Sequence, residues 1–187
     1  MSYLKFKKKL EKAIRKVCKD SKNINLHEPL FSNIEKKNID KCLKSTFVST
    51  SGKYVKVFEK NLSKIFKSKY VLSTNSGTSA LHLCYLISNI KKDEEVLIPS
   101  LNYIASANVA KYIGAIPHFV DVDEKTLGVD VEKLNQYLKK ICIKKGEVFY
   151  NKNTKRKISA IVPTHLYGSI ANIKDLQILA KKYKLTI

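Results

Sequence analysis

Hydroxyl-bearing residues flank a glycine in residues 73–78, the first polar segment, which follows a short apolar run and leads into an apolar helical pattern. Gly77 allows a close approach to the backbone, and Ser76 and Thr78 add hydroxyl donors beside the unpaired N–H groups of a helix start. This combination is suited to binding a phosphate group. An ordinary helix cap is the alternative interpretation. The spacing matches neither a Walker loop nor the GxGxxG fingerprint, so neither of those nucleotide sites is predicted.

Two later polar segments add an aromatic ring and an imidazole. Tyr103 closes residues 99–103, the second polar segment, and its ring is suited to stacking on a planar cofactor. His165 lies in residues 163–169, the third polar segment, and an imidazole can hydrogen-bond a cofactor or substrate near neutral pH. A core or interface tyrosine and a structural histidine are the alternatives. Taken together, the three segments predict a phosphorylated aromatic cofactor.

The elements that must position these segments follow an α/β pattern from residue 70 onward. Short apolar runs predict strands over residues 70–73, 95–98, 116–120, 158–162 and 185–187. Helical spacing predicts helices over residues 78–89, 103–113, 130–143 and 172–183. Residues 147–157 are predicted to form a small hairpin or an exposed loop. Alternating strands and helices favour a mostly parallel sheet, and the three polar segments are expected at the carboxyl ends of its strands.

The N-terminal part of the sequence predicts helices over residues 4–19, 32–44 and 53–67, with an extended connector over residues 23–31. Ser32 and Glu35 have the spacing of a capping box at the start of the second helix. The first helix is basic and amphipathic. We expect it to pack a thin apolar stripe on the body of the protein, and an arm that binds a membrane surface or nucleic acid is the alternative.

Composition excludes several classes of protein. The 187 residues are 44% hydrophobic, which excludes disorder of the whole chain, and the apolar runs are too short for a membrane span. The N-terminus lacks the apolar region of a secretory signal, so the cytoplasm is expected. The four cysteines and four histidines lack metal-site spacing, so no metal is expected. The net charge of +20 suits an anionic small molecule, while the scarcity of arginine makes nucleic-acid binding a minority interpretation.

Four segments, in order, resemble the N-terminal half of the DegT/DnrJ/StrS-type sugar-nucleotide aminotransferases, which are fold type I enzymes that use pyridoxal 5′-phosphate (PLP). These segments are LHEPLFSNIEKKNIDKCLKSTFVSTSGKYVKVFEKNLSKIF, NSGTSALHL, EVLIPSLNYIASANVAKYIGAIPHFVDVD and AIVPTHLYGSIANIKDLQILAKKYKL. The leading helix and the sequence TFVSTSGKYV also resemble a subgroup that acts on nucleotide-linked 4-keto-6-deoxy amino sugars in nonulosonic-acid pathways. The resemblance covers residues 26–187 and implies that they form the N-terminal part of the PLP-binding large domain. Residues 1–25, which precede it, are expected to form a basic helical arm.

The resemblance also implies roles for single residues. It assigns cofactor contacts to Ser76, Gly77, Thr78, Tyr103 and His165, and substrate-side contacts to Ser49, Thr50 and Lys53. The hydroxyl and backbone groups of the first polar segment would hold the PLP phosphate, and Tyr103 would stack on the pyridine ring. Asn102 stands where the family usually has threonine, so the resemblance implies no role for it.

The activity implied by the resemblance is transfer of an amino group, with glutamate as donor, to a nucleotide-linked 4-keto-6-deoxy sugar by a homodimer that serves cell-surface polysaccharide biosynthesis. The family's pyridine-nitrogen aspartate and Schiff-base lysine fall beyond Ile187, so no catalytic residue is assigned, and a truncated or split form that is inactive alone is expected. A sister dehydratase chemistry stays open for the same reason. Two competing interpretations of the chain are a non-catalytic phosphate- or cofactor-binding subunit and a basic nucleic-acid binder.

Overall fold

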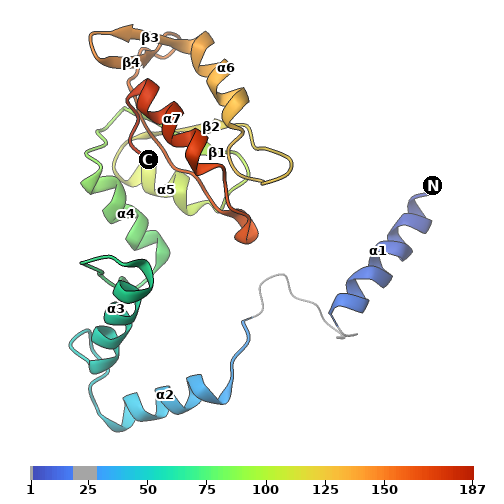
Figure 1. Ribbon diagram of the computed structural model, residues 1–187, viewed down its shortest axis with the longest axis vertical. Helices are drawn as coiled ribbons and strands as arrows, with labels where there is room; N and C mark the ends of the chain where they lie inside the picture. The colour runs from blue at the N-terminus through green and yellow to red at the C-terminus, as the bar shows by residue number, and fades with distance from the viewer. Residues whose placement is uncertain (1, 19–28) are drawn as a thin grey trace. The chain divides into compact units, whose positions relative to one another are not determined.

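The structure, a computed structural model, describes residues 2–18 and 29–187 (Figure 1). The chain divides into two units, Met1–Lys69 and Tyr70–Ile187. The domain boundary predicted between residues 25 and 26 lies outside the described residues and stays a prediction, as does most of the predicted connector over residues 23–31.

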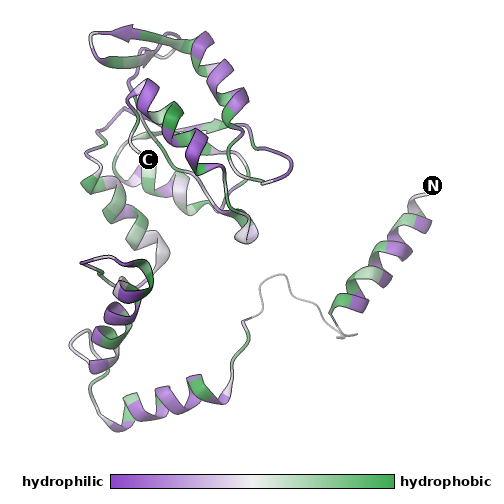
Figure 2. Ribbon diagram, in the orientation of Figure 1, coloured by the Kyte–Doolittle hydropathy of each residue, from purple (hydrophilic) through white to green (hydrophobic). Residues whose placement is uncertain are grey.

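Within the described residues, the first unit consists of helices. They are α1 (Tyr3–Val17), α2 (Asn33–Lys44) and α3 (Lys53–Phe66). Ser32 caps α2, since its Oγ accepts a hydrogen bond from the N–H of Ile34 at 3.1 Å. The carboxylate of Glu35 accepts in return from the N–H of Ser32 at 2.6 Å. This confirms the predicted capping box. In Figure 2, hydrophilic and hydrophobic residues alternate along all these helices, as their amphipathic sequences require.

The second unit is built around a three-stranded parallel sheet with the strand order β2-β1-β5. The strands are β1 (Glu95–Pro99), β2 (Ile116–Val120) and β5 (Ile158–Ile161). Every residue of the central strand β1 is buried, which explains its nearly continuous apolar sequence. The parallel sheet confirms the predicted fold class.

Helices cover both faces of this sheet. They are α4 (Gly77–Ile87), α5 (Ala105–Tyr112), α6 (Val131–Ile141) and α7 (Ile173–Tyr183). Successive residues of a strand point to opposite faces, so Val96 and Ile98 of β1 join one buried cluster and Leu97 joins the other. The first cluster includes Tyr85 of α4 and residues of α5, and the second includes residues of α6 and α7.

Three predicted elements differ from the structure. Residues 70–73 form no strand, because an extended segment becomes a strand only by pairing with a neighbouring one. Leu72 in this segment is 76% exposed. The hairpin begins before residue 147, as β3 (Cys142–Lys145) and β4 (Val148–Asn151), since the preceding helix ends at Ile141. Residues 185–187 contribute a single parallel bridge, between Thr186 and Ala160.

Candidate functional site

Helix α4 begins at Gly77, and Ser76 is its N-cap. Ser76 Oγ accepts a hydrogen bond from the N–H of Ser79 at 3.1 Å, and the carbonyl of Ser76 accepts one from the Thr74 hydroxyl at 2.9 Å. These bonds fix the direction in which the chain enters the helix. The helix cap, which is the alternative interpretation of this segment, is therefore present. A phosphate site also requires that the helix end has room and N–H donors left for a ligand.

Two backbone donors are left at this helix end. Among the residues that the structure describes, no acceptor bonds the N–H of Gly77 or of Thr78. A Cβ atom built on Gly77 would meet nothing within 4 Å, and Gly77 is not in the left-handed region. Neither backbone strain nor crowding by the protein thus requires glycine here. The first turn of α4 presents open space beside two free N–H groups, which fits a phosphate group.

Tyr103 follows β1 by four residues, and its side chain is 77% exposed. The N–H of Tyr103 donates to Asn102 Oδ1 at 2.7 Å, and Asn102 Nδ2 donates to Ser106 Oγ at 3.0 Å. Ser106 is buried in α5. The ring is therefore free to receive a planar ligand, while the backbone beneath it is held. No role for Asn102 was predicted from the sequence, and only the structure reveals these bonds.

His165 precedes a 3₁₀ turn, Leu166–Gly168, and is exposed. Its Nδ1 accepts a hydrogen bond from the N–H of Ala171 at 3.2 Å. Because Nδ1 accepts, the neutral ring carries its proton on Nε2, which can donate outward. The turn itself places Tyr167 at φ 51° and Gly168 at φ 79°, which bends the third polar segment sharply.

The parallel sheet brings the second and third polar segments to one edge. Residues 99–103 and 163–169 follow the neighbouring strands β1 and β5, so both leave the carboxyl edge of the sheet. In Figure 1 the loop after β5 and the first turn of α4 both lie on the lower side of this unit, away from the β3–β4 hairpin. Ser49, Thr50 and Lys53 belong to the first unit, so their place at the site stays a prediction.

A second polar cluster lies at the amino end of β1. Glu95 is 2% exposed, and its carboxylate accepts hydrogen bonds from Asn151 Nδ2 at 3.0 Å and from the Thr154 hydroxyl, and it contacts His118 Nδ1 at 2.7 Å. Burial raises the pKa of Glu95, but the bonds to His118, Thr154 and Asn151 outweigh burial and lower it. The sequence signal was the lone acid in an apolar strand. The cluster joins the hairpin to the sheet at the amino end of β1, at the opposite end of that strand from the second polar segment.

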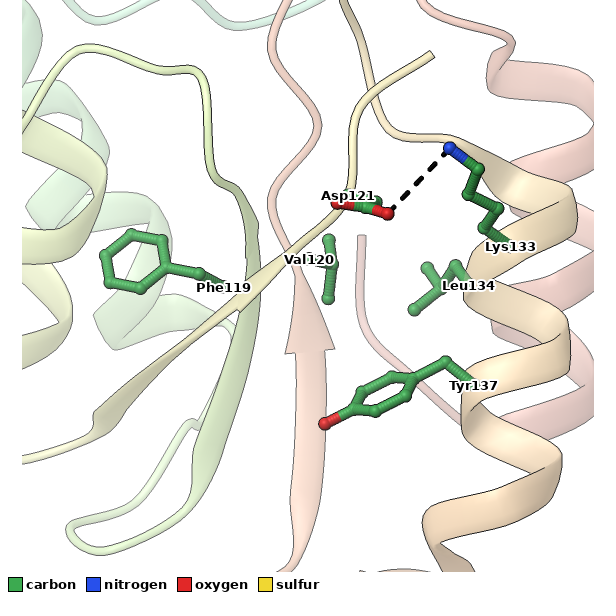
Figure 3. A pocket seen from close by; sticks show the side chains of 6 residues that line it. All are labelled: Phe119, Val120, Asp121, Lys133, Leu134 and Tyr137. Atoms are coloured by element: carbon green, nitrogen blue, oxygen red, sulfur yellow. Dashed lines mark ion pairs between the residues drawn. The ribbon is translucent and has the colours of Figure 1, made fainter.

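A surface pocket of about 320 Å³ lies between β2 and α6 (Figure 3). Its lining residues are Phe119, Val120, Asp121, Lys133, Leu134 and Tyr137. Lys133 Nζ lies 3.8 Å from Asp121 Oδ2, so the pocket's charged groups already face each other. No residue of the three polar segments lines this pocket. We therefore place the candidate site at the first turn of α4 and not at this pocket.

None of the helices in the described part of the chain has the length and apolar character that a membrane span needs.

Comparisons with known proteins agree with the α/β fold described above. Residues 30–187 match the DegT/DnrJ/EryC1/StrS aminotransferase family. GDP-perosamine synthase of Escherichia coli O157:H7 is 33% identical over 166 residues, which cover 89% of this chain and 41% of that protein. A family aminotransferase from Brucella abortus superimposes with a TM-score of 0.69 at 28% identity, over 82% of this chain and 38% of that chain.

A further solved structure bears on the cofactor. A Streptococcus pneumoniae protein described as a sugar aminotransferase was solved in its PLP form. It matches with a TM-score of 0.69 at 26% identity, over 88% of this chain and 38% of that chain. The present chain thus spans well under half the length of each of these relatives.

Proposed function

Since the chain belongs to the DegT/DnrJ/EryC1/StrS aminotransferase family, we propose that it supplies the phosphate side of a PLP site in a sugar-nucleotide aminotransferase. The observation that carries this proposal is the first turn of α4, with its open space at Gly77 and two free N–H groups. A phosphate placed there accepts from the amides of Gly77 and Thr78, and the helix dipole favours its negative charge. Ser76 adds a hydroxyl group. Its Oγ accepts from the N–H of Ser79 and lies 3.1 Å from the Ser79 hydroxyl, so the Ser76 hydrogen can point to the phosphate when the Ser79 hydroxyl is the donor of that pair.

Tyr103 and His165 act on the rest of the cofactor in this proposal. The exposed ring of Tyr103 covers one face of the pyridine ring and excludes water from it. His165 donates from Nε2 to an acceptor at the edge of the cofactor, since its Nδ1 is occupied by Ala171. When bound, PLP supplies the electron sink that lets an amino group leave one carbon and join another.

We propose a nucleotide-linked 4-keto-6-deoxy sugar as amino acceptor and glutamate as donor, in a dimeric cytoplasmic enzyme of polysaccharide or amino-sugar biosynthesis. The name of the relative GDP-perosamine synthase supports a nucleotide-linked sugar. The net charge of +20 favours such an anionic substrate. Ser49, Thr50 and Lys53 are the proposed substrate-side residues, with Lys53 as a cation for the substrate's phosphate groups.

The catalytic residues are not among these 187 residues in this proposal. The resemblance puts the pyridine-nitrogen aspartate and the Schiff-base lysine beyond Ile187, and the chain spans 41% of GDP-perosamine synthase. Residues 1–187 alone are therefore expected to bind the cofactor's phosphate side without transferring an amino group. A segment that supplies the aspartate and lysine, on the same chain or on another, would restore the reaction.

The test is to purify residues 1–187 and measure PLP binding by equilibrium dialysis, followed by an assay of glutamate-dependent amino transfer to a nucleotide-linked keto-sugar. We expect saturable PLP binding, competition by inorganic phosphate, and no turnover. Absence of saturable binding would overturn the proposed site. Turnover by these residues alone would overturn the assignment of the catalytic residues. Binding that no added C-terminal segment converts into turnover would favour a non-catalytic binding subunit.

A further inference from the structure

Both ends of the Asn102 side-chain amide form hydrogen bonds with specific partners. Its half-buried side chain contacts the N–H of Tyr103 at 2.7 Å and the hydroxyl of Ser106 at 3.0 Å. A backbone N–H can only donate, so the amide atom that faces Tyr103 is Oδ1. Nδ2 is thereby directed at Ser106 Oγ. Both bonds form together only in this orientation of the side chain, which fixes the backbone at the point where the exposed tyrosine ring projects.

Ser106 links Asn102 to the helix that carries the phosphate site. The carbonyl of Ser106 accepts a hydrogen bond from the Tyr85 hydroxyl at 3.1 Å. Tyr85 lies on α4, two turns after Gly77, and is 2% exposed. Burial raises the pKa of Tyr85, so the hydroxyl keeps its proton and remains a donor. A continuous set of hydrogen bonds thus runs from Tyr103 through Asn102 and Ser106 to α4.

We propose that Asn102 is a positioning residue, which holds Tyr103 at a fixed place relative to the first turn of α4 through Ser106 and Tyr85. The inference rests on the proposed function, in which α4 binds the cofactor's phosphate and Tyr103 covers its ring. A rigid cofactor has a fixed spacing between these two parts. Asn102 therefore sets affinity for the whole cofactor and leaves affinity for phosphate alone unchanged, because phosphate contacts only the helix end.

The first test measures the hydrogen bond itself, without any ligand. Amide hydrogen exchange is followed by NMR in the wild-type chain and in Asn102→Ala and Asn102→Asp. We expect the Tyr103 amide to exchange roughly fivefold faster in Asn102→Ala, the factor for one lost hydrogen bond. Asn102→Asp keeps the acceptor for the N–H of Tyr103, and its second oxygen can accept from the Ser106 hydroxyl, so it should keep most of the protection. The Ser79 amide, bonded to Ser76, should not change. Equal exchange at Tyr103 in all three proteins would overturn the proposal.

The second test compares two probes, PLP and inorganic phosphate, by equilibrium dialysis against the same three proteins. We expect Asn102→Ala to weaken PLP binding roughly fivefold and to leave phosphate binding unchanged, with rescue by Asn102→Asp. Loss of both affinities would indicate a general structural defect and overturn the positioning role. A wild-type chain that binds neither probe would instead overturn the proposed function, and the exchange measurement would still decide the role of Asn102.

Discussion

Glu95 Oε2 lies 2.7 Å from Nδ1 of His118, and this contact joins the neighbouring strands β1 and β2 at the amino end of β1, away from the second and third polar segments at the carboxyl edge. His118 Nε2 in turn lies 3.0 Å from the hydroxyl of Tyr137 on α6. A buried carboxylate thus reaches the protein surface through two side chains. These polar bonds hold the sheet together at the amino end of β1.

Replacing Glu95 by glutamine is expected to lower the free energy of unfolding by about 1–3 kcal/mol. Glutamine has nearly the same shape, but it loses the charge that strengthens the bonds from Thr154 and Asn151, and its NH₂ group faces donors. Urea unfolding followed by circular dichroism measures the change. As a control, Glu124→Gln alters an exposed acid and should change the free energy by less than about 0.5 kcal/mol. A Glu95→Gln protein as stable as wild type would contradict this role.

The same carboxylate predicts an acid-dependent loss of stability. The pKa of Glu95 in the folded chain is lowered from 4.5, so the unfolded chain binds more protons in the interval below pH 4.5. Stability from Glu95 is therefore fully present above pH 4.5 and decreases as the pH falls through the folded-state pKa. Urea unfolding at a series of pH values measures how the free energy of unfolding changes with pH. Below pH 4.5 this free energy should fall less steeply in Glu95→Gln than in wild type. Identical pH dependence in the two proteins would exclude this contribution of Glu95.

Ser76→Ala separates the two interpretations of the first polar segment. Loss of the N-cap should cost about 0.5–2 kcal/mol of stability, because the N–H of Ser79 loses its acceptor. If the segment also binds phosphate, PLP affinity should fall beyond what unfolding explains. Ser32→Ala removes the matching N-cap of α2 and is the control, with a similar loss of stability and unchanged PLP affinity. Equal PLP affinity in both variants would favour a helix cap alone.

The ring of Tyr103 should contribute to PLP affinity through its aromatic face. Tyr103→Phe is expected to bind PLP as wild type does, and Tyr103→Ala to bind roughly three- to tenfold more weakly, the range for an aromatic pair. Tyr112→Ala removes another ring of similar exposure, 62% against 77%, and should leave PLP binding unchanged. Titration of each variant with PLP by equilibrium dialysis measures these affinities. A hydroxyl requirement, seen as weak binding by Tyr103→Phe, would contradict stacking.

Strong local signals made much of the fold predictable. The strands at 95–98 and 158–162 were predictable because the sheet buries their apolar runs, and the strand at 116–120 from its apolar residues, although only Val120 there is buried. The Ser32 cap was predictable because a helix cap depends on nearby residues. Residues 70–73 have the composition of a strand. Whether such a segment becomes a strand depends on pairing with a neighbouring strand, which composition does not show. The bonds from Asn102 depend on where a loop places Ser106, which no residue spacing encodes.

The most direct measurement of the central claim is PLP binding by Gly77→Asp. An aspartate at the first helical position interacts favourably with the helix dipole, so the fold should be retained, while its carboxylate fills the open space and repels a phosphate. Asn33→Asp places the same group after the Ser32 cap of α2 and is the matched control. We predict loss of PLP binding in Gly77→Asp and wild-type binding in Asn33→Asp, with both proteins folded. Wild-type affinity in a folded Gly77→Asp protein would contradict a phosphate site at the first turn of α4.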